Sequence, residues 1–135
     1  MEVDRDQALA KLRGRLTPIP DGVVAVYLFG SVARGQASAA SDVDIGVLYE
    51  VTPPPTLEGL GFDLAYDLEL AIRNSVDIVV LNRAPSDLVH RVLRDGIIVV
   101  ERDRARRIAF EVQARNEYFD LAPIRARYRR MQAKT

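Results

Sequence analysis

The sequence predicts an α/β (α+β) protein in which a small mixed sheet of about four strands is flanked by helices. Two observations lead to this prediction. Four short apolar segments, rich in β-branched residues, lie among segments whose apolar residues recur at helical spacing. The connection between the first two strands holds only about one helical turn and a loop, which is too short for an ordinary crossover helix. With its 135 residues the chain is expected to form a single domain over residues 1–135.

The strands are expected where apolar residues follow one another almost without interruption. The first candidate, VVAVYLF, is apolar at every position, which is typical of a strand buried on both faces. Gly30 and Ser31 follow it directly and end it. The four predicted strands cover residues 23–29, 43–49, 75–81 and 97–101.

The helices are expected where apolar residues recur every three or four positions. Asp4 precedes the first such segment and can cap it, with Gln7 three residues later. Pro85 is placed to open a later helix, and Gly96 to end it in a C-terminal capping position. Helices are predicted over residues 4–16, 57–73, 85–95 and 103–119, with a last basic helix after Pro123.

Charge is distributed unevenly along the chain, although the formal net charge is zero. Residues 1–101 contain 9 Lys and Arg against 15 Asp and Glu, whereas residues 102–135 contain 10 against 4. This balance predicts an acidic body followed by an arginine-rich helical C-terminal segment at about 103–135. The segment is interpreted either as a solvated helix or as a surface that meets a negatively charged partner.

The composition argues against several classes of protein. Without cysteine the chain can form no disulfide, thiolate metal site or cysteine nucleophile. Neither a signal peptide nor a membrane-spanning run is recognisable, so we expect a cytoplasmic protein without membrane contact. No Gly-Lys-Ser/Thr follows a strand, which argues against a Walker-type ATPase. His90 lacks the triad order of a serine hydrolase and is interpreted as a helix-surface residue.

Three aspartates are the candidate metal ligands and catalytic residues. Asp42 and Asp44 begin the second strand two residues apart, so both side chains are expected on one face. Gly46, the next residue on that face, would leave it open for a ligand. Asp77 lies in the apolar third strand, where a buried carboxylate needs a metal or a cation such as Arg73. If these strands are neighbours, the three carboxylates converge and can hold two Mg²⁺ ions, or Mn²⁺, for in-line phosphoryl displacement.

Gly30 and Ser31 are the candidate nucleotide-binding residues. A strand that ends at Gly-Ser and continues into one helical turn presents backbone N–H groups and a hydroxyl to an anion. Gly30 allows a triphosphate to approach the backbone closely. Arg34, one turn later, is placed to neutralise phosphate charge or to pair with a strand carboxylate. A Gly-Ser turn alone is weak evidence of a ligand, but its combination with the three aspartates predicts a nucleotide site beside a metal site.

The segment GSVARGQASAASDVDIGV resembles the signature of the DNA polymerase β-like nucleotidyltransferase superfamily. The small size and the later segments VDIVVL and HRVLRDGIIVVERD are similar to the minimal nucleotidyltransferase (MNT) antitoxins of HEPN/MNT toxin–antitoxin modules. The resemblance implies that Ser31 contacts the phosphates of the nucleotide and that Asp42 and Asp44 bind both metal ions. It also implies that Asp77 holds the catalytic metal and helps to activate the acceptor hydroxyl.

The same resemblance implies ATP as the substrate and AMP transfer to a tyrosine hydroxyl of a HEPN ribonuclease toxin in a hetero-oligomer. Two other functions stay open at this point. The chain could be a non-catalytic antitoxin that blocks its partner by binding, or a nucleotidyltransferase that modifies a small molecule or RNA. Direct nucleic-acid binding is not expected, although the arginines between residues 125 and 130 could serve RNA.

Overall fold

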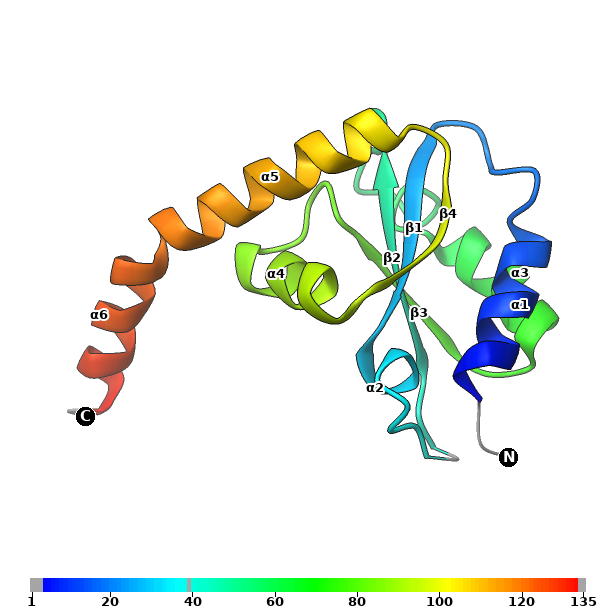
Figure 1. Cartoon of the computed structure of the whole chain (residues 1–135), viewed down its shortest axis with the longest axis horizontal. Coiled ribbons are helices and arrows are strands. Elements are labelled where there is room, and N and C mark those ends of the chain that lie inside the picture. Colours follow the sequence, from blue (N-terminus) through cyan, green and yellow to red (C-terminus); the bar gives the residue numbers. More distant parts are fainter. Residues whose placement is uncertain (1–3, 39, 134–135) are drawn as a thin grey trace.

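A four-stranded mixed sheet forms the centre of the computed structural model, which describes residues 4–38 and 40–133 (Figure 1). The strand order is β3-β2-β1-β4, and only β2 and β3 run parallel. This confirms the predicted fold class. The elements are α1 (Arg5–Arg15), β1 (Val23–Phe29), α2 (Gly30–Ala33), β2 (Val43–Tyr49), α3 (Phe62–Ile72), β3 (Val76–Val80), α4 (Ser86–Asp95), β4 (Ile97–Glu101), α5 (Arg104–Asp120) and α6 (Ala122–Ala133).

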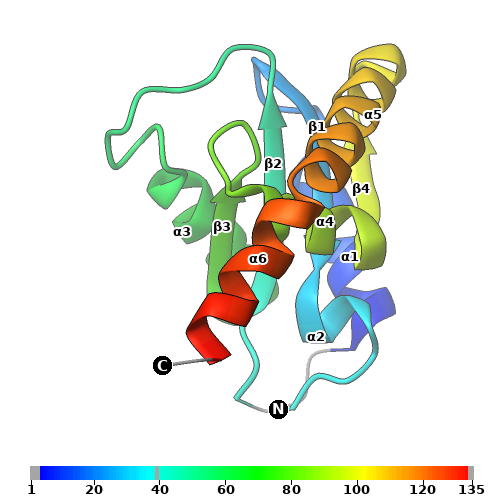
Figure 2. The same ribbon diagram turned by 90° about the vertical axis from the view of Figure 1, so that its left-hand side faces the viewer.

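Helices cover both faces of the sheet, which explains why β1 is apolar throughout (Figure 2). On one face, Leu12 of α1 and Leu68 of α3 pack with Val26 of β1. On the other, Val92 of α4 packs with Tyr27 of β1. A register irregularity between Val23 and Ala25 interrupts the alternation of β1. Burying side chains of this size stabilises the fold by about 1.5–3 kcal/mol each.

Local signals explain the helix ends that the sequence predicts correctly. The side chain of Asp4 caps α1 by accepting a hydrogen bond from the backbone N–H of Gln7 at 3.2 Å. Pro85 is the N-cap of α4, and Gly96 is its C-cap in an extended conformation (φ −74°). The two C-terminal helices meet at Leu121, so Pro123 lies in the first turn of α6, where no helical hydrogen bond from its nitrogen is needed.

The predicted helix over residues 57–73 is wrong in its first turn, because α3 begins only at Phe62. Residues 57–60 form turns, and a Cβ on Gly59 would lie 1.9 Å from the carbonyl oxygen of Pro54. Leu57 therefore stays 70% exposed although it continues the helical spacing. Periodicity alone does not distinguish a helical turn from a turn-rich loop of similar composition.

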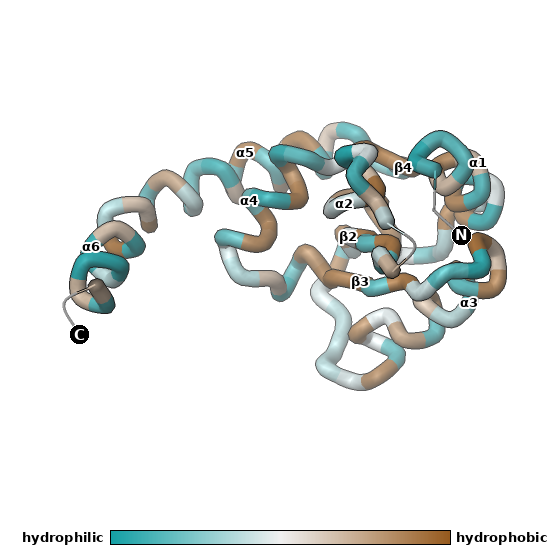
Figure 3. The backbone as a smooth tube through the Cα atoms, turned by 90° about the horizontal axis from the view of Figure 1, so that it is seen from below, coloured by the Kyte–Doolittle hydropathy of each residue, from teal (hydrophilic) through white to brown (hydrophobic). Residues whose placement is uncertain are grey.

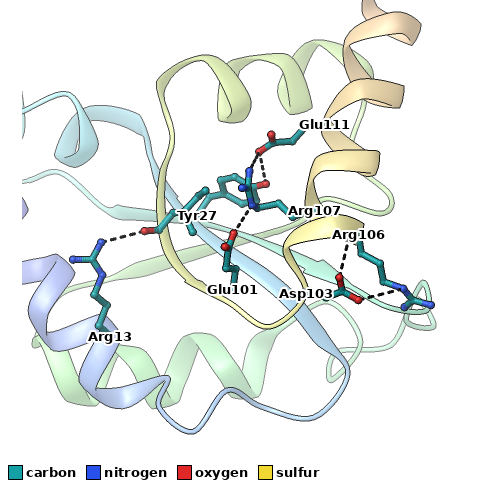
Figure 4. A network of polar contacts seen from close by, with 8 residues as sticks. Arg13, Tyr27, Glu101, Asp103, Arg106, Arg107 and Glu111 are labelled. Atoms are coloured by element: carbon teal, nitrogen blue, oxygen red, sulfur yellow. Dashed lines mark hydrogen bonds and ion pairs between the residues drawn. The ribbon is translucent and has the colours of Figure 1, made fainter.

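Helices α5 and α6 extend away from the sheet, and the residues described in them include no buried one (Figure 3). Arg107 anchors α5 through ion pairs with Glu101 and Glu111 (Figure 4). The hydroxyl of Tyr27 donates a hydrogen bond to Glu111 at 2.8 Å, and burial together with this bond raises the pKa of the Tyr27 phenol. Among the described residues, no helix has the length and apolar character needed to cross a membrane.

Stacked side chains hold α5 and α6 against α4. The rings of His90 and Tyr118 stack 3.7 Å apart, and the guanidinium of Arg125 lies 3.8 Å from the Tyr118 ring centroid. Arg125 also pairs with Asp87 at 3.3 Å. His90 is therefore a half-buried packing residue rather than a solvated one.

Candidate active site

The two aspartates on neighbouring strands lie directly opposite each other. Asp44 of β2 pairs in register with Asp77 of β3, because the strands run parallel and begin at the same end. On its other side Asp44 is in register with Phe29, the last residue of β1. The chain turns into α2 at Gly30, so the Gly-Ser corner meets both carboxylates at one end of the sheet.

A cavity of about 430 Å³ opens at this end, and we call it the strand-end cavity. It contains five of the six residues predicted from the sequence. Asp42 is the exception, because it is exposed and does not line the cavity. The lining residues are Phe29, Gly30, Ser31, Arg34, Asp44, Asp77, Val79, Leu88, Arg91 and Asp95.

Gly30 approaches Asp44 so closely that no other residue fits. Its φ is +76°, and a Cβ added there would lie 2.1 Å from Oδ2 of Asp44. A side chain at this position would therefore be strained and would also displace the carboxylate. The glycine that ends β1 thus determines where the Asp44 side chain can lie.

Burial raises the pKa of the Asp44 carboxyl, and the nearby charges of Asp77 and Asp42 raise it further. Arg34 acts in the opposite direction but does not cancel the effect. Asp77 and Asp42 therefore both repel the charge of Asp44, even though Asp42 lies outside the cavity. A cation between them would remove this repulsion, and oxygen-only donors suit Mg²⁺ or Mn²⁺.

The three candidate carboxylates do not form a compact group of metal ligands in the described part of the chain. Within residues 4–38 and 40–133, no three acidic, histidine or cysteine side chains are grouped closely enough to hold an ion. Asp77 is exposed, which corrects the expectation that it is buried within its strand. It forms no hydrogen bond or ion pair with Arg73 or any other described residue, so the donor chemistry of Asp44 and Asp77 fits a bound cation.

Gly46 does not leave the acidic face of β2 open, as its position two residues after Asp44 suggests. It is buried, and a Cβ there would lie 3.3 Å from Val92 and 3.4 Å from Leu81. The glycine instead lets α4 pack closely on the sheet. This packing brings α4 to the edge of the strand-end cavity.

Three residues of α4 line the cavity, and its two charged ones, Arg91 and Asp95, were not predicted from the sequence. Asp95 pairs with Arg94 at 2.9 Å and with Arg34 at 3.8 Å. Arg91, one turn earlier, is exposed and makes no hydrogen bond or ion pair with the described residues. The cavity therefore combines carboxylates on the sheet with cationic side chains on α2 and α4, which suits a metal-bound polyphosphate.

Residues 19–105, about two thirds of the chain, match a family model described as "Polymerase beta, Nucleotidyltransferase". The chain belongs to this nucleotidyltransferase family. The match covers the whole sheet, including Gly30, Ser31 and the three aspartates. A comparison with curated protein sequences gives no significant match.

Solved structures similar to this nucleotidyltransferase include toxin–antitoxin complexes. One contains AMP-PNP and is 27% identical, with a TM-score of 0.76 over 89% of this chain and 94% of the other. A protein proposed to be a minimal nucleotidyltransferase is 34% identical, with a TM-score of 0.59 over 70% and 95% of the two chains. A complex of the tri-AMPylated Shewanella oneidensis HEPN toxin with an MNT antitoxin is 24% identical, with a TM-score of 0.71 over 92% and 94%.

Proposed function

We propose that this nucleotidyltransferase transfers AMP from ATP to a hydroxyl of a partner HEPN toxin and thereby silences it. The observation that carries the proposal is the strand-end cavity, where Asp44 and Asp77 lie beside Ser31, Arg34 and Arg91. Arg91 has no ion-pair partner among the described residues. A site with carboxylates and arginine side chains fits a nucleotide triphosphate with its metal ions better than a neutral ligand.

In this proposal each side chain has a distinct role. Arg34 and Arg91 neutralise phosphate oxygens, and the Ser31 hydroxyl donates to one of them. Asp42, Asp44 and Asp77 would hold two Mg²⁺ ions. When bound, these ions polarise the reacting phosphate and neutralise the charge that develops on it. Asp77, the more exposed of the two carboxylates Asp44 and Asp77, orients the attacking hydroxyl.

The nucleotide and the partner are inferred from the structural neighbours. One neighbour binds AMP-PNP, and another is a complex in which the HEPN toxin is tri-AMPylated. Their shared fold supports ATP as the nucleotide and a protein as the acceptor.

A steric antitoxin without catalysis is the second candidate, favoured by the surface of α5 and α6. These helices bury none of their described residues. They expose several large apolar side chains that a partner could cover. The exposed residues are Ile108, Val112, Phe119, Ile124, Tyr128 and Met131.

Transfer of radioactive label tests the proposal. The chain is incubated with Mg²⁺ and a candidate HEPN partner protein, using ATP labelled either at the α- or at the γ-phosphate. We expect only the α-label on the HEPN protein, and none with Asp42→Asn combined with Asp44→Asn. γ-Label would indicate phosphoryl transfer instead. No label, with the two proteins still bound to each other, would favour the steric antitoxin.

A further inference from the structure

Three large apolar side chains form an exposed stripe along α3, which we call the α3 stripe. Phe62, Tyr66 and Leu70 are spaced four residues apart, so they lie on one face of the helix, and each is between 58% and 65% exposed. Phe62 and Tyr66 also line a cavity of about 350 Å³ between α3 and β3. Covering this stripe is favourable, because burial of apolar surface contributes about 25 cal/mol per Å².

The surroundings of the α3 stripe are acidic. Residues 50–80 contain six Asp and Glu but only one Lys or Arg. Asp63 lies next to Phe62, is exposed, and forms no ion pair with the described residues. Glu69 and Asp77 line the cavity between α3 and β3, and no Lys, Arg or His is among its described lining residues. A surface that covers the α3 stripe should therefore be both apolar and basic.

Helix α6 provides a surface of this kind. It contains four arginines and no Asp or Glu, and the arginines other than Arg125 form no ion pair with the described residues. Arg127 shares a face with the apolar residues of α6, whereas Arg129 lies on the opposite face. These apolar residues recur at helical spacing, are each between 61% and 63% exposed, and are Ile124, Tyr128 and Met131.

The two surfaces cannot meet within one chain. Helices α3 and α6 lie at opposite ends of the molecule, with the sheet and α4 between them (Figure 1, Figure 3). Arg125 holds α6 in this position through its contacts with Tyr118 and Asp87. A second copy that lies antiparallel beside the first, related to it by a twofold axis, brings α6 of each copy to α3 of the other.

We propose that this chain forms such a twofold dimer, in which α6 of each copy docks on the α3 stripe of the other. The proposal is independent of the reaction proposed above. Because the dimer makes the same contact twice, each contact needs to bury only about 800 Å² to reach the roughly 1,600 Å² of a typical stable interface. The apolar side chains would form the centre of each contact, and Arg127 and the acidic residues around Asp63 its charged rim.

The α3 stripe suits α6 better than a nucleic acid does. An RNA could neutralise the arginines of α6, but it would leave Ile124 and Met131 in water. The α3 stripe of a second copy matches both the apolar and the basic character of α6. Attraction between the two surfaces also explains why the acidic and basic residues of this chain are separated along the sequence.

Sedimentation velocity of the nuclease-treated chain tests the dimer. The chain is measured alone, without nucleotide or HEPN protein, at increasing concentrations in about 100 mM NaCl. Arg127→Glu is the test variant, and Arg129→Glu is the matched control, because it changes the same charge on the opposite face of α6. Asp63→Arg is measured alone and combined with Arg127→Glu. Thermal melting verifies that each variant is folded, as expected for substitutions at exposed positions.

We expect the original chain to sediment as a dimer whose Kd rises at roughly 500 mM NaCl. Arg127→Glu and Asp63→Arg should each raise the Kd about tenfold or more, whereas Arg129→Glu should change it less than about threefold. The combined variant should return to within about threefold of the original Kd, because the reversed charges attract again.

Three results would overturn the dimer. The chain could stay monomeric at every concentration, which would leave the surface of α6 to an RNA or to another protein. Arg127→Glu and Arg129→Glu could weaken the dimer equally, which would show that the apolar face of α6 is not the contact. The combined variant could fail to recover, which would place α6 on a surface other than the α3 stripe. None of these results bears on nucleotidyl transfer, which the labelling experiment tests separately.

Discussion

A Cβ on Gly30 would lie 2.1 Å from Oδ2 of Asp44, so the end of β1 and the first residues of β2 fit together only with glycine at this corner. The contact joins the two halves of the candidate site. It also means that the position of the Asp44 carboxylate, a proposed metal ligand, depends on a residue that has no side chain of its own.

Gly30→Ala should therefore abolish transfer while leaving the protein folded. A side chain at positive φ costs about 1–2 kcal/mol, and displacement of a reacting group by about 1 Å reduces rates ~100-fold. Gly22→Ala is the matched control, because Gly22 has φ +80° and nothing within 4 Å of the added Cβ. Both variants should lose the stability that positive φ costs in urea unfolding, Gly30→Ala somewhat more because of its contact with Asp44, but only Gly30→Ala should lose label transfer. Equal activity of the two would show that Asp44 tolerates the contact.

Asp44→Asn should stabilise the metal-free protein near neutral pH. The pKa of Asp44 is raised from 3.8 by burial and by the neighbouring carboxylates. The folded state thus holds this proton more tightly than the unfolded state. Protonation of Asp44 therefore contributes its full stabilisation below the ordinary pKa of an aspartate. This contribution is lost as the pH rises through the raised pKa of Asp44 in the folded state. Without the charge, the melting temperature in EDTA should rise by about 2 °C or more, a gain that shrinks towards acidic pH.

Glu58→Gln is the control for this measurement. It removes an exposed carboxylate that lines neither the strand-end cavity nor the cavity between α3 and β3. It should leave the melting temperature unchanged. Mg²⁺ should stabilise the original chain more than Asp44→Asn. A lower melting temperature for Asp44→Asn in EDTA would contradict the repulsion described here.

Arg91→Ala should weaken nucleotide binding, because it removes a cation that faces the strand-end cavity and has no partner among the described residues. Loss of one charge-assisted hydrogen bond corresponds to about a tenfold rise in the Kd for AMP-PNP. Arg129→Ala removes the same charge from the exposed surface of α6 and should have little effect. Equal Kd values for the two variants in titration calorimetry would place the phosphates elsewhere.

Arg107→Ala should destabilise the attachment of α5. The Arg107 side chain is 11% exposed and lies between Glu101 and Glu111, so its removal leaves two carboxylates facing each other. We expect a loss of about 2–3 kcal/mol in urea unfolding, with nucleotide binding retained. Arg115→Ala, an exposed position on the same helix, should cost little. A similar loss for both would mean that the ion pairs do not hold the helix.

The strands could be predicted because their signal is local. The runs at 23–29 and 43–49 are apolar enough to be strands without knowledge of their neighbours, and β1 and β2 have these bounds. The meeting of Asp44 with Asp77 follows once β2 and β3 are taken as neighbours, and the structure pairs these two residues in register.

The remaining features depend on tertiary packing, which a single sequence does not show. Arg91 reaches the strand-end cavity only because Gly46 lets α4 lie close to the sheet. The cavity between α3 and β3 arises because α3 begins only at Phe62, after a turn at Gly61. A Cβ on Gly61 would lie 2.6 Å from Ile78. The spacing of apolar residues in the sequence indicates neither the close approach of α4 to the sheet nor the late start of α3.

Ribonuclease activity of the proposed HEPN partner after treatment with a small amount of this chain tests the central claim most directly. The chain is added with ATP and Mg²⁺ at roughly one molecule to twenty of the partner, since an enzyme turns over and a steric inhibitor does not. We predict that the partner loses all ribonuclease activity. The partner should stay active when ATP is left out, and also when the variant that combines Asp42→Asn with Asp44→Asn is used. Loss of activity only at equimolar amounts, with or without ATP, would contradict catalysis and leave a protein that acts by binding alone.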